Sequence, residues 1–237
     1  MDSPLISIIT VCFNTIETIE QTILSVINQT YPHIEYIIID GGSTDGTVEI
    51  IKKYADRITY WVSEPDKGIY DAMNKGIIRA TGSWLSFMNA GDRFANSNVL
   101  DFVFTKKLDS KIKVIYGNHI VDSNITTITV KSKKVSVFYK EMPFCHQAAF
   151  LKNENLYYDT NFRIAADYKL FRYIYKKYGA NSFVKINEIV AIFDDSGISS
   201  TNKNLLRKEY NTLYKQFGGI YYYYDCFKLI IKKIFVR

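Results

Sequence analysis

The first ninety residues alternate between short apolar runs and amphipathic segments, and this alternation restricts the fold more than any other feature. The apolar runs are residues 5–14, 35–39, 58–62 and 84–88. Helical spacing of apolar side chains predicts helices at residues 16–27, 44–54 and 70–80. Buried strands that alternate with helices form a parallel sheet with right-handed crossovers. The sequence therefore predicts a doubly wound α/β fold.

Beyond Asp92 the predicted helices and strands no longer alternate regularly. Helices are predicted at residues 99–108, 162–177 and from 202 onward, and strands at 114–117 and 184–193. Residues 126–137 alternate β-branched and basic side chains, which indicates antiparallel strands near a sheet edge. We expect a mainly parallel sheet with an antiparallel portion and C-terminal helices.

The composition excludes several classes of protein. Three separated cysteines fit neither a disulfide framework nor a zinc site. We find no signal peptide and no apolar run long enough to span a membrane, so we expect a cytoplasmic protein. The net charge of +6 suits a phosphate-rich ligand, an anionic membrane surface or nucleic acid. Nucleic acid is disfavoured, because the α/β half has no concentrated basic stripe.

Mostly polar residues lie at or just past the ends of the four predicted parallel strands. They are Thr10, Phe13 and Asn14, then Asp40 and Ser43, then Glu64 and Asp66, and finally Asn89 and Asp92. The carboxyl ends of parallel strands share one edge of a sheet, where ligands bind. Carboxylates gathered there repel one another, so folding alone does not explain them. This edge is the predicted ligand site.

Two of these groups have alternative interpretations. The segment from Asn89 to Asp92 offers hard oxygen ligands for Mg²⁺ or Mn²⁺, or it is an ordinary turn. Asp40 accepts from a base N–H or a ribose hydroxyl, or it only forms the turn Asp-Gly-Gly-Ser. The first strand is not followed by Gly-x-Gly-x-x-Gly, and a Gly-Lys-Ser/Thr loop is absent, which argues against dinucleotide and P-loop binding.

Several motifs together resemble the family 2 glycosyltransferases of GT-A fold. In the first hundred residues they are Ser-Ile-Ile-Thr-Val-Cys-Phe-Asn at 7–14, Ile-Asp-Gly-Gly-Ser-Thr-Asp-Gly-Thr at 39–47, and Asn-Lys-Gly-Ile at 74–77 followed by Ala-Thr-Gly at 80–82. Residues 64–74 resemble more closely the bacterial branch that builds surface polysaccharides, including colanic-acid-type enzymes. Cys145-His146-Gln147, the segment 166–170 and Gly-Ile-Ser-Ser at 197–200 extend the resemblance over about residues 4–210.

This resemblance implies an inverting transferase of hexosyl or N-acetylhexosaminyl type. It would move a sugar from a nucleotide-diphosphate sugar to a hydroxyl of a glycan or lipid-linked acceptor in cell-surface polysaccharide synthesis. The implied domain covers residues 1–210, with a nucleotide-sugar half at 1–95 and an acceptor half at 96–210. Such chemistry needs a base for the acceptor proton and positive charge for the leaving diphosphate. Asp167 matches the family's base position, although a carboxylate is also common at a helix start.

The resemblance and the strand-end pattern together nominate the other site residues. The donor-binding set is Thr10, Phe13, Asn14, Asp40, Ser43, Glu64, Asp66, Asn74, Lys75, Asn89 and Ala90. The residues expected near the acceptor or the diphosphate are His146, Gln147, Ser199, Lys203 and Arg207. His146 either hydrogen-bonds the acceptor or the diphosphate, or is a satisfied, partly buried histidine.

The sequence departs from the family pattern at two motifs. The usual Asp-x-Asp is here Asn89-Ala90-Gly91, followed by Asp92. Either Asp92 supplies the carboxylate for Mn²⁺ or Mg²⁺ with Asn89 assisting, or the metal binds weakly and Lys203 and Arg207 hold the diphosphate. The usual Asp-Asp is here Asp40-Gly41, which leaves the nucleobase open. These departures keep a non-catalytic module that binds a nucleotide sugar or glycan as the alternative, while an acid retained at Asp167 favours an enzyme.

The tail at 211–237 is aromatic and basic. This composition predicts an amphipathic helix on the cytoplasmic face of a membrane, or a helix packed on the domain.

Overall fold

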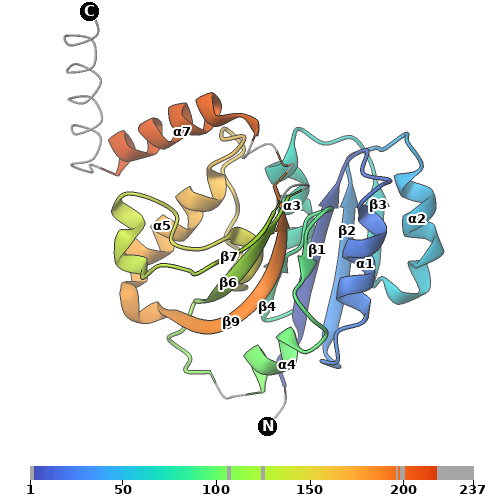
Figure 1. Ribbon diagram of the computed structural model, residues 1–237, viewed down its shortest axis with the longest axis horizontal. Helices are drawn as coiled ribbons and strands as arrows, with labels where there is room; N and C mark the ends of the chain where they lie inside the picture. Colours follow the sequence, from blue (N-terminus) through green and yellow to red (C-terminus); the bar gives the residue numbers. More distant parts are fainter. Residues whose placement is uncertain (1–2, 106–107, 124–125, 196, 198–200, 218–237) are drawn as a thin grey trace, which may run out of the picture.

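A computed structural model describes residues 3–105, 108–123, 126–195, 197 and 201–217 of the 237-residue chain. Within these residues the strands form one nine-stranded sheet in the order β3-β2-β1-β4-β8-β6-β9-β5, with β7 paired to β6. The strands are β1 (Ile6–Cys12), β2 (Ile34–Asp40), β3 (Tyr60–Ser63), β4 (Trp84–Phe87), β5 (Arg93–Phe94), β6 (Val114–Asp122), β7 (Thr127–Val130), β8 (Ala149–Lys152) and β9 (Phe183–Asp194). Figure 1 shows α1 and α2 at one end of this sheet and α5 and α7 at the other.

Helices cover both faces of the sheet. They are α1 (Ile19–Ile27), α2 (Thr47–Lys53), α3 (Ile69–Arg79), α4 (Val99–Phe104), α5 (Ala166–Tyr178) and α7 (Lys203–Gln216). Short 3₁₀ turns occur at Ala55–Arg57, Val135–Tyr139, His146–Ala148 and Ala180–Ser182. Successive side chains of a strand point to opposite faces. Accordingly, Ile9 of β1 joins a core with α3, α5 and α7, while Ile8 joins a second core with α1, α2 and α4.

The first four strands in sequence are parallel neighbours, as the alternating pattern predicts. Cys12 of β1 pairs with Asp40 of β2, and Asp40 pairs with Ser63 of β3. β4 lies on the other side of β1, also parallel to it. Their carboxyl ends therefore share one edge, and the doubly wound half of the prediction is confirmed.

The second half adds the expected antiparallel portion, but with strands that the sequence did not reveal. β8 is antiparallel to both β4 and β6 and lies between them. β6 continues to Asp122, well past the predicted end at Gly117. A register shift between Tyr116 and His119 carries β6 past this glycine, where an added Cβ would lie 2.5 Å from Val190 Cγ2. The glycine marks a bulge with close approach to β9 rather than a strand end.

Other element boundaries differ from the predictions. Within 126–137 only Thr127–Val130 is a strand, and a 3₁₀ turn begins at Val135. α5 begins at Ala166 rather than near residue 162, because the preceding segment is held as a loop by hydrogen bonds described below. α7 crosses the expected boundary at residue 210 and ends at Gln216.

α7 packs on α5 through aromatic side chains. Tyr210 stacks on Tyr168 with ring centroids 4.6 Å apart, and Leu213 is fully buried. The part of the predicted tail at 218–237 lies outside the described residues. Among the helices that the structure describes, none has the length and apolar character needed to cross a membrane.

Candidate active site

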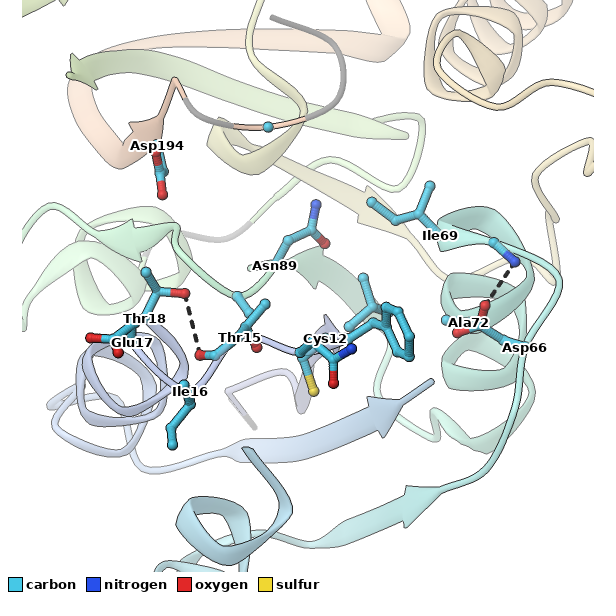
Figure 2. Close-up of a pocket in the computed structure, with 16 residues that line it drawn as sticks. Cys12, Thr15, Ile16, Glu17, Thr18, Asp66, Ile69, Ala72, Asn89 and Asp194 are labelled. Carbon is cyan, nitrogen blue, oxygen red and sulfur yellow. Dashed lines mark hydrogen bonds between the residues drawn. The ribbon is translucent and has the colours of Figure 1, made fainter. Parts of the chain in front are cut away.

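A cavity of about 590 Å³ opens at the carboxyl ends of β1 and β4 (Figure 2). The loop after β1 forms one wall, the start of α3 forms another, and the end of β9 closes it from above. Five of the predicted donor-binding residues line it, namely Phe13, Asn14, Asp66, Asn89 and Ala90. Phe13 is 59% exposed, so an aromatic face is available to a ligand. The predicted ligand edge is thus a real cavity.

Asn14 and Ser43 hold the loops after β1 and β2 together. The Asn14 backbone is left-handed, with φ of 51°, a conformation that asparagine tolerates better than most residues. Its side-chain oxygen accepts from the N–H of Thr44 at 2.9 Å, and its own N–H donates to Ser43 Oγ at 2.7 Å. These bonds fix the cavity wall on which Asn14 lies.

Asp40 lies beneath this wall and is fully buried. Its Oδ2 accepts from the N–H of Gly42 at 3.1 Å, from the N–H of Ser43 at 2.8 Å and from Ser63 Oγ at 2.6 Å. Burial opposes ionisation, but the hydrogen bonds from Ser43 and Ser63 outweigh it and hold the pKa of Asp40 below its usual value. This geometry favours the turn-forming role over a nucleobase contact.

Replacing Asp40 with alanine is therefore expected to destabilise the fold, because several buried donors lose a charged acceptor. We expect the free energy of unfolding in urea to fall by about 2–4 kcal/mol. Asp56→Ala, at an exposed carboxylate after α2, is the control and should change it little. Equal effects of the two changes would contradict the structural role of Asp40.

Two other predicted donor-binding residues are hydrogen-bonded to the backbone of other segments. Thr10 is fully buried and donates to the carbonyl of Met88 at 2.7 Å. Asn74 binds the backbone of Tyr158 twice, donating to its carbonyl and accepting from its N–H, both at 2.8 Å. Asn74 thus joins α3 to the second half of the chain, and neither residue lines the cavity.

The predicted donor-binding residues Glu64 and Lys75, and the basic residues expected near the acceptor or the diphosphate, lie outside the cavity. Lys75 forms an ion pair with Glu64 at 2.7 Å. Lys203 and Arg207 are exposed on α7. Glu64, Lys75, Lys203 and Arg207 do not line the cavity, and Ser199 lies outside the described residues.

The cavity wall is instead acidic. Glu17, Asp66 and Asp194 line it, and the described residues of its wall include no lysine or arginine. A phosphate-bearing ligand in this cavity would therefore need a cation to accompany it.

Two glycines explain how these carboxylates reach the cavity. A Cβ added at Gly41 would lie 2.6 Å from Asp66 Oδ2, and one added at Gly91 would lie 2.9 Å from Asp194 Oδ2. Gly91 also has φ of 100°, where other side chains are strained. At both positions the sequence has glycine where an acid is usual in the resembled family. In each case a carboxylate from another strand end lies beside the glycine.

Asp92, the predicted metal carboxylate, lies behind this wall. It is 4% exposed, and its Oδ1 accepts from the N–H of Asp194 at 2.9 Å. Burial raises the pKa of Asp92 to about 7, and the charge of Asp194 adds to this effect. Asp92 does not line the cavity, whereas Asp194 does. The geometry gives Asp92 the role of holding Asp194.

Asn89 connects the larger cavity with a second one of about 200 Å³, because it lines both. Its Oδ1 is buried and has no hydrogen-bond partner within the described structure. Figure 2 shows Asn89 near the middle of the larger cavity and Asp194 above it, at the end of β9. A buried amide oxygen without a partner, in a cavity that carboxylates also line, is a candidate ligand for a divalent cation.

The oxygen ligands suit a Mg²⁺ or Mn²⁺ ion that is bound partly by the substrate, rather than an ion enclosed by protein ligands alone. The described residues contain no group of three or more His, Cys, Asp or Glu side chains that could hold a metal. Mg²⁺ usually binds one or two carboxylates together with substrate phosphates and water. Asn89 and Asp194, with Asp92 behind them, match that pattern.

The second cavity contains Asp167. Its Oδ1 accepts from the N–H of Tyr168 at 2.7 Å and from the hydroxyl of Tyr70 at 3.1 Å. Burial raises the pKa of Asp167 to about 6, although these hydrogen bonds oppose the rise. A carboxylate with this proton affinity can accept a proton near neutral pH and release it again.

His146 and Gln147 also line the second cavity. His146 is 8% exposed, and its Nε2 lies 2.8 Å from the Tyr158 hydroxyl. Burial lowers the pKa of His146 to about 3, so the ring is neutral in the working pH range and gives no positive charge to a diphosphate. The structure favours the satisfied, buried histidine. The hydrogen bond between Asp92 and Gln147 lowers the pKa of Asp92 and connects Gln147 to the acidic wall.

Sequence reasoning missed Asp194 and Tyr70. Asp194 directly follows the predicted strand 184–193, so the strand-end criterion would have found it if applied to the second half of the chain. Tyr70 gave no signal, because a tyrosine in the first turn of an amphipathic helix is ordinary.

Comparisons with known proteins point to one family. The family model described as Glycosyl transferase family 2 matches residues 7–179. An uncharacterized glycosyltransferase of Mycobacterium tuberculosis is 32% identical over 210 residues, which is 84% of this chain and 78% of that protein. A PGL/p-HBAD biosynthesis glycosyltransferase of Mycobacterium bovis is 30% identical over 178 residues, which is 71% of this chain and 68% of that protein.

Solved structures support the same fold. S. aureus TarS 1–349 in complex with UDP-GlcNAc has a TM-score of 0.64 at 16% identity, covering 81% of this chain and 59% of that one. The mannosyltransferase PcManGT from Pyrobaculum calidifontis, in complex with GDP-Man and Mn²⁺, has a TM-score of 0.62 at 19% identity, covering 81% and 57%. The chain thus spans less than two thirds of these two structures. With the family match and the shared fold, this chain belongs to the family 2 glycosyltransferases and has the GT-A fold.

Proposed function

We propose that the chain is an inverting transferase of hexosyl or N-acetylhexosaminyl type, which uses a nucleotide-diphosphate sugar as donor. The observation that carries this proposal is the junction of the two cavities at Asn89. The acidic wall for a cation and diphosphate lies in one cavity, and a carboxylate of raised pKa lies in the other. The sugar to be transferred would lie between them.

The larger cavity suits the nucleoside and the diphosphate. Phe13 offers an exposed aromatic face for a base, and Asp66 offers a carboxylate oxygen beside Gly41 for a base N–H or a ribose hydroxyl. Asp66 is already oriented, because its Oδ1 accepts from the N–H of Gly68 at 2.7 Å. In this proposal Asp66 replaces the acid that the family usually has at the position of Gly41.

Asn89 and Asp194 would hold the divalent cation, with Asp92 fixing the backbone of Asp194. When bound, Mg²⁺ or Mn²⁺ neutralises the charge that develops on the leaving diphosphate. PcManGT is described with GDP-Man and Mn²⁺, which supports a metal in this fold. Asp194 would take the role that an acid at the position of Gly91 has in the family.

Asp167 would act as the base. As the acceptor hydroxyl oxygen bonds to the anomeric carbon, its proton passes to Asp167 and the bond from that carbon to the diphosphate oxygen breaks. Attack opposite the leaving group inverts the anomeric centre. Tyr70 orients Asp167 by donating to its Oδ1. Burial of Asp167 keeps its proton affinity high enough to assist the attack.

The acceptor is proposed to be a glycan or lipid-linked saccharide in surface polysaccharide synthesis. The motif at residues 64–74 and the relative named for PGL/p-HBAD biosynthesis support this assignment. Segment 218–237 is basic and aromatic, and this composition is what supports contact with the cytoplasmic face of a membrane.

A thermal shift screen tests the donor proposal. UDP-, GDP- and dTDP-sugars are added with Mn²⁺, with Mg²⁺ and with EDTA. One donor should raise the unfolding midpoint by about 4 °C or more in the presence of metal, and EDTA should remove most of that shift. Turnover is then measured as nucleoside diphosphate release with saccharide acceptors. Failure of every nucleotide sugar to stabilise the protein would contradict the proposal, and binding without turnover would favour the non-catalytic module.

A further inference from the structure

Glu209 of α7 is a buried carboxylate that the proposed chemistry does not use. It is 8% exposed, and it reaches back across the molecule to the loop before α5. Its Oε1 accepts from the N–H of Arg163 at 2.8 Å. Its Oε2 accepts from the N–H of Ile164 at 3.0 Å and from the N–H of Ala165 at 2.9 Å. One side chain therefore binds three consecutive backbone amides.

These amides directly precede α5, the helix that carries Asp167 in its first turn. The cap position of α5 is Ala165, which has no side chain able to accept a hydrogen bond. Amides at a helix start need acceptors, and a negative charge there interacts favourably with the helix dipole. Glu209 accepts from the amide of Ala165 at the cap position and places a carboxyl group at the helix start, while the amide of Tyr168 donates to Asp167 Oδ1 at 2.7 Å.

Ile164 is held from both sides, and this connects Glu209 with the site. Its N–H donates to Glu209, while its carbonyl accepts from the Tyr70 hydroxyl at 2.7 Å. The same hydroxyl lies 3.1 Å from Asp167 Oδ1. Because a tyrosine has one hydroxyl proton, a shift of Ile164 would change how Tyr70 divides that proton between the two acceptors.

We propose that Glu209 is a positioning residue for Asp167: by fixing residues 163–165 from α7, it sets the place of the Asp167 carboxylate in the second cavity. The proposal rests on the proposed function for its catalytic meaning. It adds a residue of α7 that belongs to none of the motifs named above.

Electrostatics agree with this geometry. The negative charge of Glu209 raises the pKa of Asp167, in addition to the larger effect of burial. The other ionisable groups around Asp167 come from several elements. They are Tyr70 of α3, Cys145 and Tyr158 of the second half, Tyr210 of α7, and His146 and Arg163 in the cavity wall. Glu209 adds a second carboxyl group to this set.

Glu209→Gln tests the proposal, because glutamine keeps the size but removes the charge and offers one acceptor oxygen in place of two. Glu49→Gln, at an exposed glutamate of α2, is the control for loss of one charge. In Glu209→Gln, amide hydrogen exchange at residues 163–165 should accelerate by about tenfold or more, while β1 and β2 are unchanged. With donor and acceptor present, kcat should fall by about tenfold with the donor KM unchanged. The acid limb of the pH–rate profile should move to lower pH.

The outcomes separate this inference from the proposed function. Unchanged exchange at residues 163–165 would overturn the inference. A lower unfolding midpoint with unchanged kcat and an unchanged acid limb would also overturn it, since that is the signature of a purely structural role. If the wild-type chain transfers no sugar, the proposed function fails on its own. In that case two measurements still test the inference, each made on wild type and on Glu209→Gln. Amide hydrogen exchange at residues 163–165 shows whether Glu209 holds this segment, and NMR titration of the Asp167 carboxyl shows whether Glu209 affects its pKa.

Discussion

Replacing Asp167 with asparagine is expected to slow sugar transfer by about 10²- to 10⁴-fold, the usual contribution of a general base. The amide keeps the shape of the side chain but accepts no proton from the acceptor hydroxyl. Donor binding should persist, because Asp167 lines the second cavity and not the larger one. The measurements are the initial rate of nucleoside diphosphate release and the thermal shift with donor.

Asp159→Asn is the matched control for this change. Asp159 forms an ion pair with Lys169 of α5 and lines neither cavity of the site. It should leave the rate nearly unchanged. Equal losses in the two variants would show that the effect of Asp167→Asn is structural and would contradict its role as base.

The pKa of Asp167 also predicts how the rate depends on pH. Asp167 must be ionised to accept a proton, and burial raises its pKa to about 6. The rate should therefore fall as the pH drops through about 6. The raised pKa means that the folded state binds this proton more tightly than the unfolded state does. The contribution of protonated Asp167 to the free energy of unfolding is therefore lost as the pH rises. Asp167→Asn should accordingly keep or raise the unfolding midpoint at pH 7 to 8.

Replacing Asp194 with asparagine is expected to weaken binding of Mn²⁺ by about tenfold or more when a nucleoside diphosphate is present. The change removes the carboxylate that lies in the cavity wall next to Gly91, while the backbone N–H bonded to Asp92 is kept. Titrating Mn²⁺ against the unfolding midpoint, with UDP and with GDP, measures this without turnover.

Asp195→Asn is the control, because Asp195 is exposed and lies next in the sequence. If both variants bind Mn²⁺ as the wild-type chain does, the cation is held elsewhere. Asp92→Asn then becomes the informative comparison, since Asp92 is the carboxylate nominated by the sequence motif alone.

The sequence predicted those parts of the molecule in which local pattern and tertiary burial agree. β1 and β2 are buried on both faces and each precedes an amphipathic helix, so their parallel pairing and the ligand edge followed from the alternation. β8 was not found, because four residues that follow a 3₁₀ turn directly carry no periodic signal of their own. Its central place in the sheet is decided by partners far away in sequence.

The same limit applies to the site. The sequence placed the segment from Asn89 to Asp92 at the end of β4, where Asn89 and Ala90 line the larger cavity, but it could not show that Asp92 faces inward and supports Asp194. That relation depends on the pairing of β9 with β5, which directly follows Asp92, and this pairing is a long-range feature. Glu209 is a second example, since it lies 44 residues after Ala165, the backbone amide that it binds. Hydrogen bonds from a side chain to a distant backbone leave no signature in spacing.

The place of β8 between β4 and β6 has a consequence for how the chain assembles. β4 can pair with β1 early during synthesis, but its other edge stays open until the ribosome has released residues through Lys152. Such non-local pairing slows folding, and an unpaired apolar edge can capture other chains. The parallel strands of the first ninety residues are thus completed by a strand of the second half, and a fragment that ends after β4 would keep one edge of its sheet open for aggregation.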